Sequence, residues 1–182
     1  MSTEGLGSAL LVTARNAIAK RFGLTGSPVE PVAELAEPGA TFVTLTQGGQ
    51  LRGCIGSLEA YRPLAIDVAE NALAAAFRDH RFAPLSQEEF PRTRVEVSLL
   101  TPAEPFPVTS EADALARLRP GIDGLVLSYG RRRATFLPQV WESLPDARQF
   151  MAQLKLKAGL PADFWHADLT LARYGVSKWK EK

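Results

Sequence analysis

The chain has 182 residues, of which 46% are hydrophobic and 23% charged, and its formal net charge is +1. This is the composition of a folded globular protein that can bury a substantial core. The balanced charge argues against nucleic acid or an anionic membrane as a partner, and a single cysteine excludes an intrachain disulfide, a multi-cysteine zinc site and an iron–sulfur cluster. No apolar run approaches the ~20 residues that a membrane span needs. We therefore expect a cytoplasmic protein with no metal or other cofactor.

The first hundred residues show the patterns of a helix, a hairpin, a second helix and a strand. Apolar residues at helical spacing predict a helix over about 6–18 that stops at Gly23. Strands are predicted over 42–46 and 51–55, with Gly48 and Gly49 in the turn. Pro63 opens an alanine-rich helical pattern that ends near Arg78. A loop over 79–84 follows, then a short helix over 86–91 with Ser86 and Glu89 at the spacing of a capping box, and an alternating strand over 94–100.

The remaining residues repeat part of this order after an internal boundary. Prolines at 102, 105 and 107 place a subdomain boundary near 101–109, within what is otherwise one domain over 1–182. A helix over about 110–118, a hairpin over 125–137, a helix from near Pro145 to Gly159 and a strand over 168–173 follow. The tail over 178–182 is expected to fray. Both halves run hairpin, helix, strand, so we hypothesise an α+β fold of two similar subdomains with a groove between them.

The segment 51–56 contains the cysteine and is the first candidate site. In a strand, Leu51 would face the core, whereas Arg52, Cys54 and Gly56 would share the other face. A thiol beside a cation ionises more readily and becomes a nucleophile, which makes Cys54 a candidate catalytic thiol and Arg52 its electrostatic partner. Alternatively, Cys54 packs as a small hydrophobic residue. Gly53 and Gly56 are candidate ligand-binding positions because glycine lets a ligand approach the backbone closely.

Three charged residues elsewhere extend this candidate site. Asp79 and Arg81 lie in a polar loop that could position an anionic ligand; alternatively, they tie down the local backbone where the helix ends. If the strand over 94–100 neighbours the strand over 51–55, Glu96 pairs with Arg52 or acts as a base. A solvated strand face explains Glu96 equally well.

The remaining motifs carry less information. Arginines 131–133 read as a charged turn, without interleaved aromatic residues that would indicate nucleic-acid binding. The motifs GxxxxGK[ST], GxGxxG, GxSxG, HExxH and CxxC are absent.

Several of these segments, in this order, resemble the AMMECR-domain family. The residues are LRGCIG at 51–56, AAFRDHRFAPL at 75–85, EVSLL at 96–100, FLPQVW at 136–141 and KAGL at 157–160. The resemblance covers about residues 8–175 and departs at His80, where members usually have proline. It implies an α+β fold of two subdomains with the LRGCIG face in a groove between them. It also adds Gln139, in the FLPQVW segment, to the ligand-binding candidates.

The resemblance further implies possible partners. Microbial relatives of the type called AmmeMemoRadiSam system protein A are encoded beside a Memo-like protein and a radical S-adenosylmethionine enzyme. Two hypotheses follow. The favoured one is an adaptor or ligand-binding component of such a modification pathway, with a small-molecule or protein ligand. The alternative is a thiol-dependent enzyme that uses Cys54 with Arg52.

Overall fold

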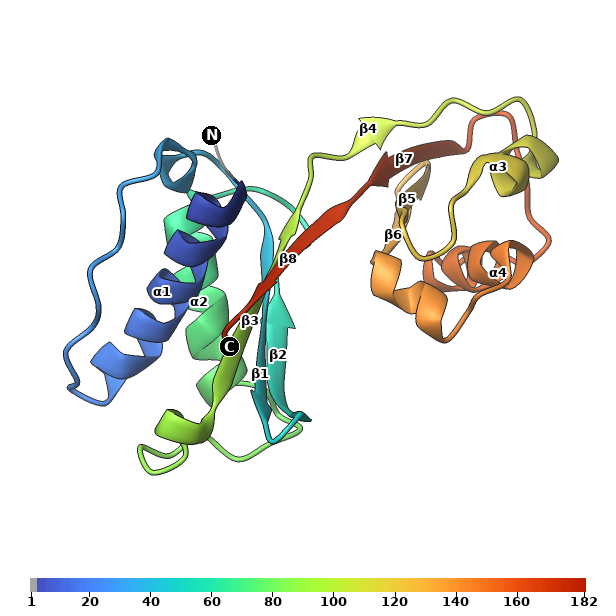
Figure 1. Ribbon diagram of the computed structural model, residues 1–182. Coiled ribbons are helices and arrows are strands. Elements are labelled where there is room, and N and C mark those ends of the chain that lie inside the picture. Colours follow the sequence, from blue (N-terminus) through green and yellow to red (C-terminus); the bar gives the residue numbers. More distant parts are fainter. Residues whose placement is uncertain (1–2) are drawn as a thin grey trace. The chain divides into compact units, whose positions relative to one another are not determined.

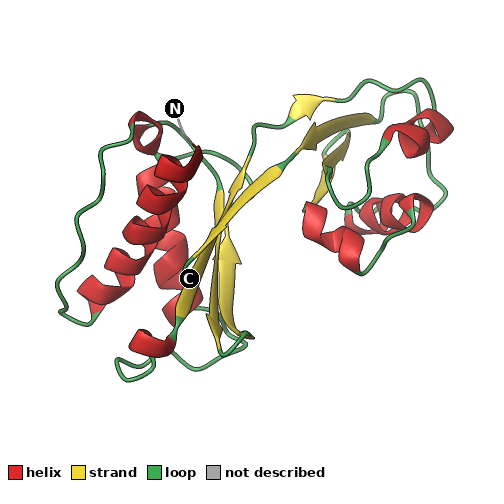
Figure 2. Cartoon of the chain, in the orientation of Figure 1, coloured by secondary structure: helices red, strands yellow, loops and turns green. Residues whose placement is uncertain are grey.

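A computed structural model describes residues 3–182, which form four α-helices and two four-stranded sheets (Figures 1 and 2). The α+β class predicted from the sequence is therefore confirmed. The chain divides into two compact units. The first comprises the chain up to Leu100 together with Ser177–Lys182, and the second comprises Thr101–Val176. No helix among the described residues is both long and apolar enough to cross a membrane.

The first unit packs two helices on a four-stranded sheet. Its elements are α1 (Thr3–Arg21), the 3-10 turn η1 (Ala33–Ala36), β1 (Thr41–Gln47), β2 (Gln50–Gly56), α2 (Leu64–Phe77), the 3-10 turn η2 (Phe90–Arg92), β3 (Arg94–Leu100) and β8 (Val176–Lys180). The strand order is β2-β1-β3-β8. Gly48 and Gly49 both have positive φ, at 55° and 80°. This is the backbone that a tight two-residue hairpin turn requires, and it explains the double glycine.

Both helices of the first unit cover the same face of the sheet, as Figure 1 shows. Apolar residues of the two helices meet those of β1 and β3 there: Leu10, Ile18, Val68, Ala72, Val43, Leu45, Val95 and Val97. Trp179 of β8 packs against Gly7 of α1, so β8 belongs to the same core. Alternate residues point away from the helices. We call the surface that these residues form the open face. Its residues are Phe42, Thr44, Thr46, Leu51, Cys54, Gly56, Arg94, Glu96, Ser98, Lys178 and Lys180.

A β-bulge changes the alternation that the sequence predicts for β2. Leu45 pairs with Gly53, but the next pair is Thr46 with Leu51, so Arg52 is the extra residue. Leu51 therefore shares the face of Thr46 and is 44% exposed. The prediction that Leu51 joins the core is wrong, because a bulge reverses the facing of the residues that precede it.

The second unit has the same kind of core. Its elements are β4 (Glu104–Pro105), α3 (Glu111–Arg117), β5 (Gly124–Tyr129), β6 (Arg132–Phe136), the 3-10 turn η3 (Pro138–Glu142), α4 (Ala147–Lys157) and β7 (Thr170–Tyr174), with strand order β4-β7-β5-β6. Trp141 stacks on Phe150 at a centroid distance of 3.8 Å, and both rings are buried. Lys155 is fully buried, and its Nζ donates to Oε1 of Glu111 at 2.5 Å.

The duplicated topology inferred from the sequence is present in the strand order. The first unit runs β1, β2, α2, β3 with strand order β2-β1-β3, and the second runs β5, β6, α4, β7 with strand order β6-β5-β7. In each unit the first strand of the hairpin is central, and the strand after the helix pairs with it.

Two predicted elements differ from the structure. The tail is not frayed, because residues 178–180 belong to β8 and Glu181 is anchored. Its N–H donates to Val95 O at 3.0 Å, and its carboxylate accepts from Val95 N–H and from Arg15, both at 2.9 Å. The short helix over 86–91 is only a turn followed by η2. The Glu89 carboxylate still accepts from Ser86 N–H at 2.8 Å, as the predicted capping pair requires.

Candidate functional site

Cys54 lies at one end of a polar row on the open face. Thr44 is paired with Cys54 on one side and with Glu96 on the other. Thr44 Oγ1 and Cys54 Sγ are 3.2 Å apart, and the thiol is half-buried. Because β1 separates β2 from β3, Glu96 stands two strand spacings, or about 9.6 Å, from Cys54. The prediction that Glu96 pairs with Arg52 is therefore wrong.

The partner of Arg52 is Glu89, from the loop after α2. Arg52 Nε and Nη2 donate to the two Glu89 carboxylate oxygens at 3.0 and 3.1 Å. The side chain of Arg52 is only 13% exposed, and its guanidinium lies 5.8 Å from the Phe82 ring. The Arg52 guanidinium, helped by Ser86 N–H, lowers the pKa of Glu89 to about 2. Arg52 is thus held in a bidentate ion pair, while its Nη1 is buried without a hydrogen-bond partner among the described residues.

Asp79 and Arg81 together occupy the outer edge of β2. Asp79 Oδ2 accepts from Cys54 N–H at 2.9 Å, and Arg81 Nη2 donates to Cys54 O at 3.4 Å. The two side chains bond each other through Arg81 Nη2 and Nε, at 2.7 and 3.0 Å. Hydrogen bonding to Arg81 and to Cys54 N–H holds the pKa of Asp79 well below its usual range. The pair therefore satisfies the outward backbone groups of Cys54 as a neighbouring strand would, which protects this sheet edge from pairing with other chains.

Both glycines of the motif lie against the protein's own atoms. A Cβ on Gly53 would lie 2.1 Å from the carbonyl oxygen of Ala75 in α2, so only glycine allows this close packing of strand and helix. A Cβ on Gly56 would lie 2.2 Å from the ring of Phe42 on the open face. In this structure both positions serve packing, and the spaces above them are filled.

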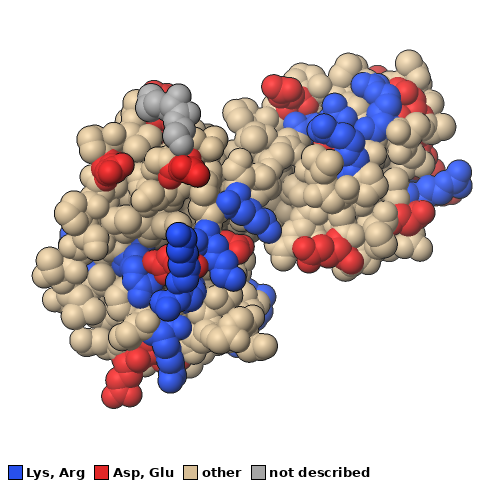
Figure 3. All heavy atoms as spheres, in the orientation of Figure 1, with Lys and Arg blue, Asp and Glu red and all other residues tan. Residues whose placement is uncertain are grey.

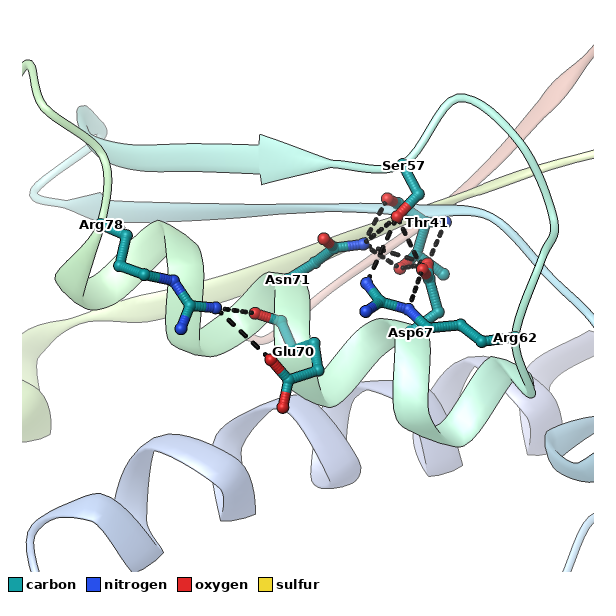
Figure 4. Close-up of polar contacts among 7 residues, drawn as sticks. All are labelled: Thr41, Ser57, Arg62, Asp67, Glu70, Asn71 and Arg78. Carbon is teal, nitrogen blue, oxygen red and sulfur yellow. Dashed lines mark hydrogen bonds and ion pairs between the residues drawn. The ribbon is translucent and has the colours of Figure 1, made fainter.

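Three further residues, Arg78, His80 and Gln139, each have surroundings of their own. Arg78 bonds Glu70 at 3.4 Å, along the exposed side of α2 (Figure 4). His80 is exposed beside Asp79, and Gln139 is exposed in η3 of the second unit.

A buried polar cluster that the sequence reading missed lies at the start of α2 (Figure 4). Asp67 is fully buried and accepts five hydrogen bonds. The donors are Thr41 N–H and Oγ1 at 2.7 Å each, Ser57 Oγ at 2.6 Å, Arg62 Nε at 2.8 Å and Asn71 Nδ2 at 3.0 Å. Such a satisfied carboxylate fixes the entry to β1, the exit from β2 and the first turn of α2 relative to each other. A signal existed in the sequence, because Asp67 and Asn71 lie one turn apart within the apolar stripe of the helix.

The open face is basic at the end opposite Cys54. Arg94, Lys178 and Lys180 lie on it, whereas Glu96 is its one acidic side chain among the described residues. Basic side chains gather over the end of β8 in the first unit, while basic and acidic side chains are interspersed on the visible face of the second (Figure 3). A ligand carrying acidic groups matches this face best. Within residues 3–182 no three His, Cys, Asp or Glu side chains are grouped so that they could hold a metal ion.

A repeated hairpin–helix–strand unit with a glycine-bearing edge strand defines a recognisable class of α+β protein. The crystal structure of the uncharacterized protein PH0010 from Pyrococcus horikoshii is similar, with a TM-score of 0.80 and 32% identity, covering 100% of this chain and 94% of that one. A protein from Methanothermobacter thermautotrophicus is 45% identical over 146 residues, 77% of this chain and 74% of that protein. Protein MJ0810 of Methanocaldococcus jannaschii is 43% identical over 124 residues, 65% of this chain but only 60% of its own length.

The family follows from the sequence match. The AMMECR1 family pattern covers residues 11–179. The chain belongs to the AMMECR1 family, as the resemblance of its motifs predicted.

Proposed function

We propose that the open face of the first unit is a non-catalytic binding surface, and that the protein acts as an adaptor or ligand-binding component rather than as a thiol enzyme. The observation that carries this proposal is the state of the two arginines beside Cys54. Arg52 is paired with Glu89 and Arg81 with Asp79, in each case by a bidentate contact. Cys54 Sγ lies 3.2 Å from the Thr44 hydroxyl, which is not a base at neutral pH.

The rest of the face supports recognition. At one end it has an exposed apolar residue, Leu51, with the Cys54 thiol and the neighbouring Thr44 hydroxyl, and toward the other end it has three basic side chains. Such a surface offers apolar contact beside charge, as binding surfaces do. The ligand class that fits is a small molecule or protein segment with acidic groups. The partners proposed on the family resemblance are a Memo-like protein and a radical S-adenosylmethionine enzyme.

Coexpression with these two partners, followed by copurification, tests the proposal. Lys178→Glu reverses one charge on the open face, and Lys20→Glu makes the same change at an exposed position of α1 as a matched control. We expect wild type, Lys20→Glu and Cys54→Ala to copurify with a partner and Lys178→Glu to be depleted. Equal recovery of the two lysine variants would refute the proposed face.

The thiol hypothesis makes the opposite prediction. If Cys54→Ala keeps its partner but abolishes the product of the pathway, Cys54 performs chemistry and the adaptor proposal fails. Rapid alkylation of Cys54 in the folded protein at neutral pH would point the same way.

A further inference from the structure

Three aromatic rings meet at one end of the second unit, outside the site described above. Tyr129 closes β5, while Phe164 and His166 come from the connection between α4 and β7. The Tyr129 ring centroid is 4.9 Å from that of Phe164 and 5.3 Å from that of His166. The planes of Phe164 and His166 agree within 12°, with centroids 6.5 Å apart. Two rings thus share one orientation, and the third supports both from the side.

Exposure distinguishes this trio from an ordinary core cluster. The stacked pair Trp141–Phe150 is buried at 3% and 0%, whereas the His166 side chain is 47% exposed and Tyr129 and Phe164 are half-buried. His166 is also oriented, because Asp168 N–H donates to its Nδ1 at 3.0 Å. In the neutral ring this places the hydrogen on Nε2, as a donor to whatever lies against the imidazole.

A basic residue, Arg131, follows Tyr129 by two positions in the turn after β5. Gly130, with φ of 57°, and Arg131 form the turn between β5 and β6, and Tyr129 pairs directly with Arg132 across the hairpin. Arg132 donates to Gly159 O, which ties the hairpin to the end of α4. Arg131 is exposed and makes no hydrogen bond or ion pair to the part of the chain that the structure describes. It is therefore available to an anion.

We propose that Tyr129, Phe164, His166 and Arg131 form a binding site for a planar base that carries a phosphate. The exposed ring of His166 supplies the stacking surface and its Nε2–H a hydrogen bond, while Arg131 pairs with the phosphate. The sequence alone pointed away from this, because no aromatic residue interleaves the arginines at 131–133. Two of the three rings, those of Phe164 and His166, come from residues more than thirty positions later in the chain. A free nucleotide and a single-stranded nucleic acid share this chemistry.

Calorimetric titration of the full chain with AMP, adenosine, inorganic phosphate and a ten-residue oligothymidine separates the contributions. We expect saturable AMP binding that is stronger than that of adenosine or phosphate alone. His166→Ala and Arg131→Ser should each weaken it on the order of tenfold. Tyr61→Ala and Arg92→Ser, which change an exposed tyrosine and an exposed arginine of the first unit, are matched controls and should leave it unchanged.

Each outcome of the titrations either supports or refutes the proposed site. Binding of the oligomer without AMP, with the same loss in the variants, supports the site and identifies single-stranded nucleic acid as the source of the base. Phosphate binding as tightly as AMP would overturn the stacking role. Absence of saturable binding to both AMP and the oligomer overturns the whole proposal. The imidazole C–H resonances of His166 in the wild-type protein should shift on binding, a readout that requires no variant to fold.

Discussion

Replacing Gly53 by alanine tests whether this glycine of the LRGCIG motif is a packing residue. The added Cβ would lie 2.1 Å from Ala75 O, about 1.4 Å short of an ordinary contact of ~3.5 Å. The obstructing atom is a backbone carbonyl in the last turn of α2, so no rotamer change can clear it. Strand and helix must separate, and Val43, Leu45 and Val68 lie in the same core.

The expected cost is about 3 kcal/mol, the upper end of what overpacked cores show. With a urea dependence of about 2–3 kcal/mol per molar, the unfolding midpoint should fall by about 1–1.5 M. The assay is urea denaturation followed by circular dichroism, with hydrogen exchange of residues 64–77 to localise the effect. Gly5→Ala is the matched control, because a Cβ on Gly5 of α1 meets nothing within 4 Å. It should be neutral or stabilise by up to about 1 kcal/mol.

A result within about 0.5 kcal/mol of wild type for Gly53→Ala would refute the packing argument. If stability were kept but partner copurification lost, the glycine would instead be there for a ligand. The experiment thus separates the two roles that the motif glycine can have.

Three further predictions concern the carboxylates. Because folding lowers the pKa of Glu89 to about 2, its ion pair stabilises the protein fully above about pH 4.5 and is lost as the pH falls toward 2. Glu89→Gln should lower the free energy of unfolding by about 3 kcal/mol at pH 7, because it leaves the enclosed Arg52 without an anion. In urea titrations, the free energy of unfolding of this variant should also fall less than that of the wild type as the pH is lowered; an equal fall would contradict the prediction. Asp67→Asn should cost about 3–5 kcal/mol, measured by thermal unfolding, because an amide cannot accept all five hydrogen bonds; a loss below 1 kcal/mol would show that the cluster rearranges cheaply. Asp79→Ala frees the β2 edge at Cys54 and should cause concentration-dependent self-association in sedimentation velocity, whereas a sedimentation profile like that of wild type would mean the edge is protected by other means.

The periodicity of the sequence predicted the repeated units well because each half is locally consistent. Gly48–Gly49 determines one hairpin, and the alternation of Val95 and Val97 determines the strand that joins it. The alternation in the sequence did not predict the bulge at Arg52, which lies next to Gly53, where β2 packs against a residue of α2 more than twenty positions along the chain.

The contacts of the candidate-site residues were hard to predict from the sequence. Glu89 was read as a helix cap, and it does accept from Ser86 N–H, yet the same carboxylate also pairs with Arg52. Glu96 was chosen on the assumption that β3 neighbours β2, which a sequence cannot decide. Strand order depends on which faces must be buried, and that is a property of the whole sheet.

The order of the last strands has a consequence for synthesis. β4 follows β3 in the chain but pairs with β7, and β8 follows β7 but completes the sheet of β3. The first unit is therefore interrupted by all of Thr101–Val176. A ribosome finishes the second unit before it delivers the strand that closes the first. The edge of β3 therefore stays unpaired while some 75 residues are added. At typical rates of translation this takes on the order of 4–15 s. During that interval the nascent first unit exposes a sheet edge that the finished protein covers, and chaperone binding or misassembly is most to be expected there.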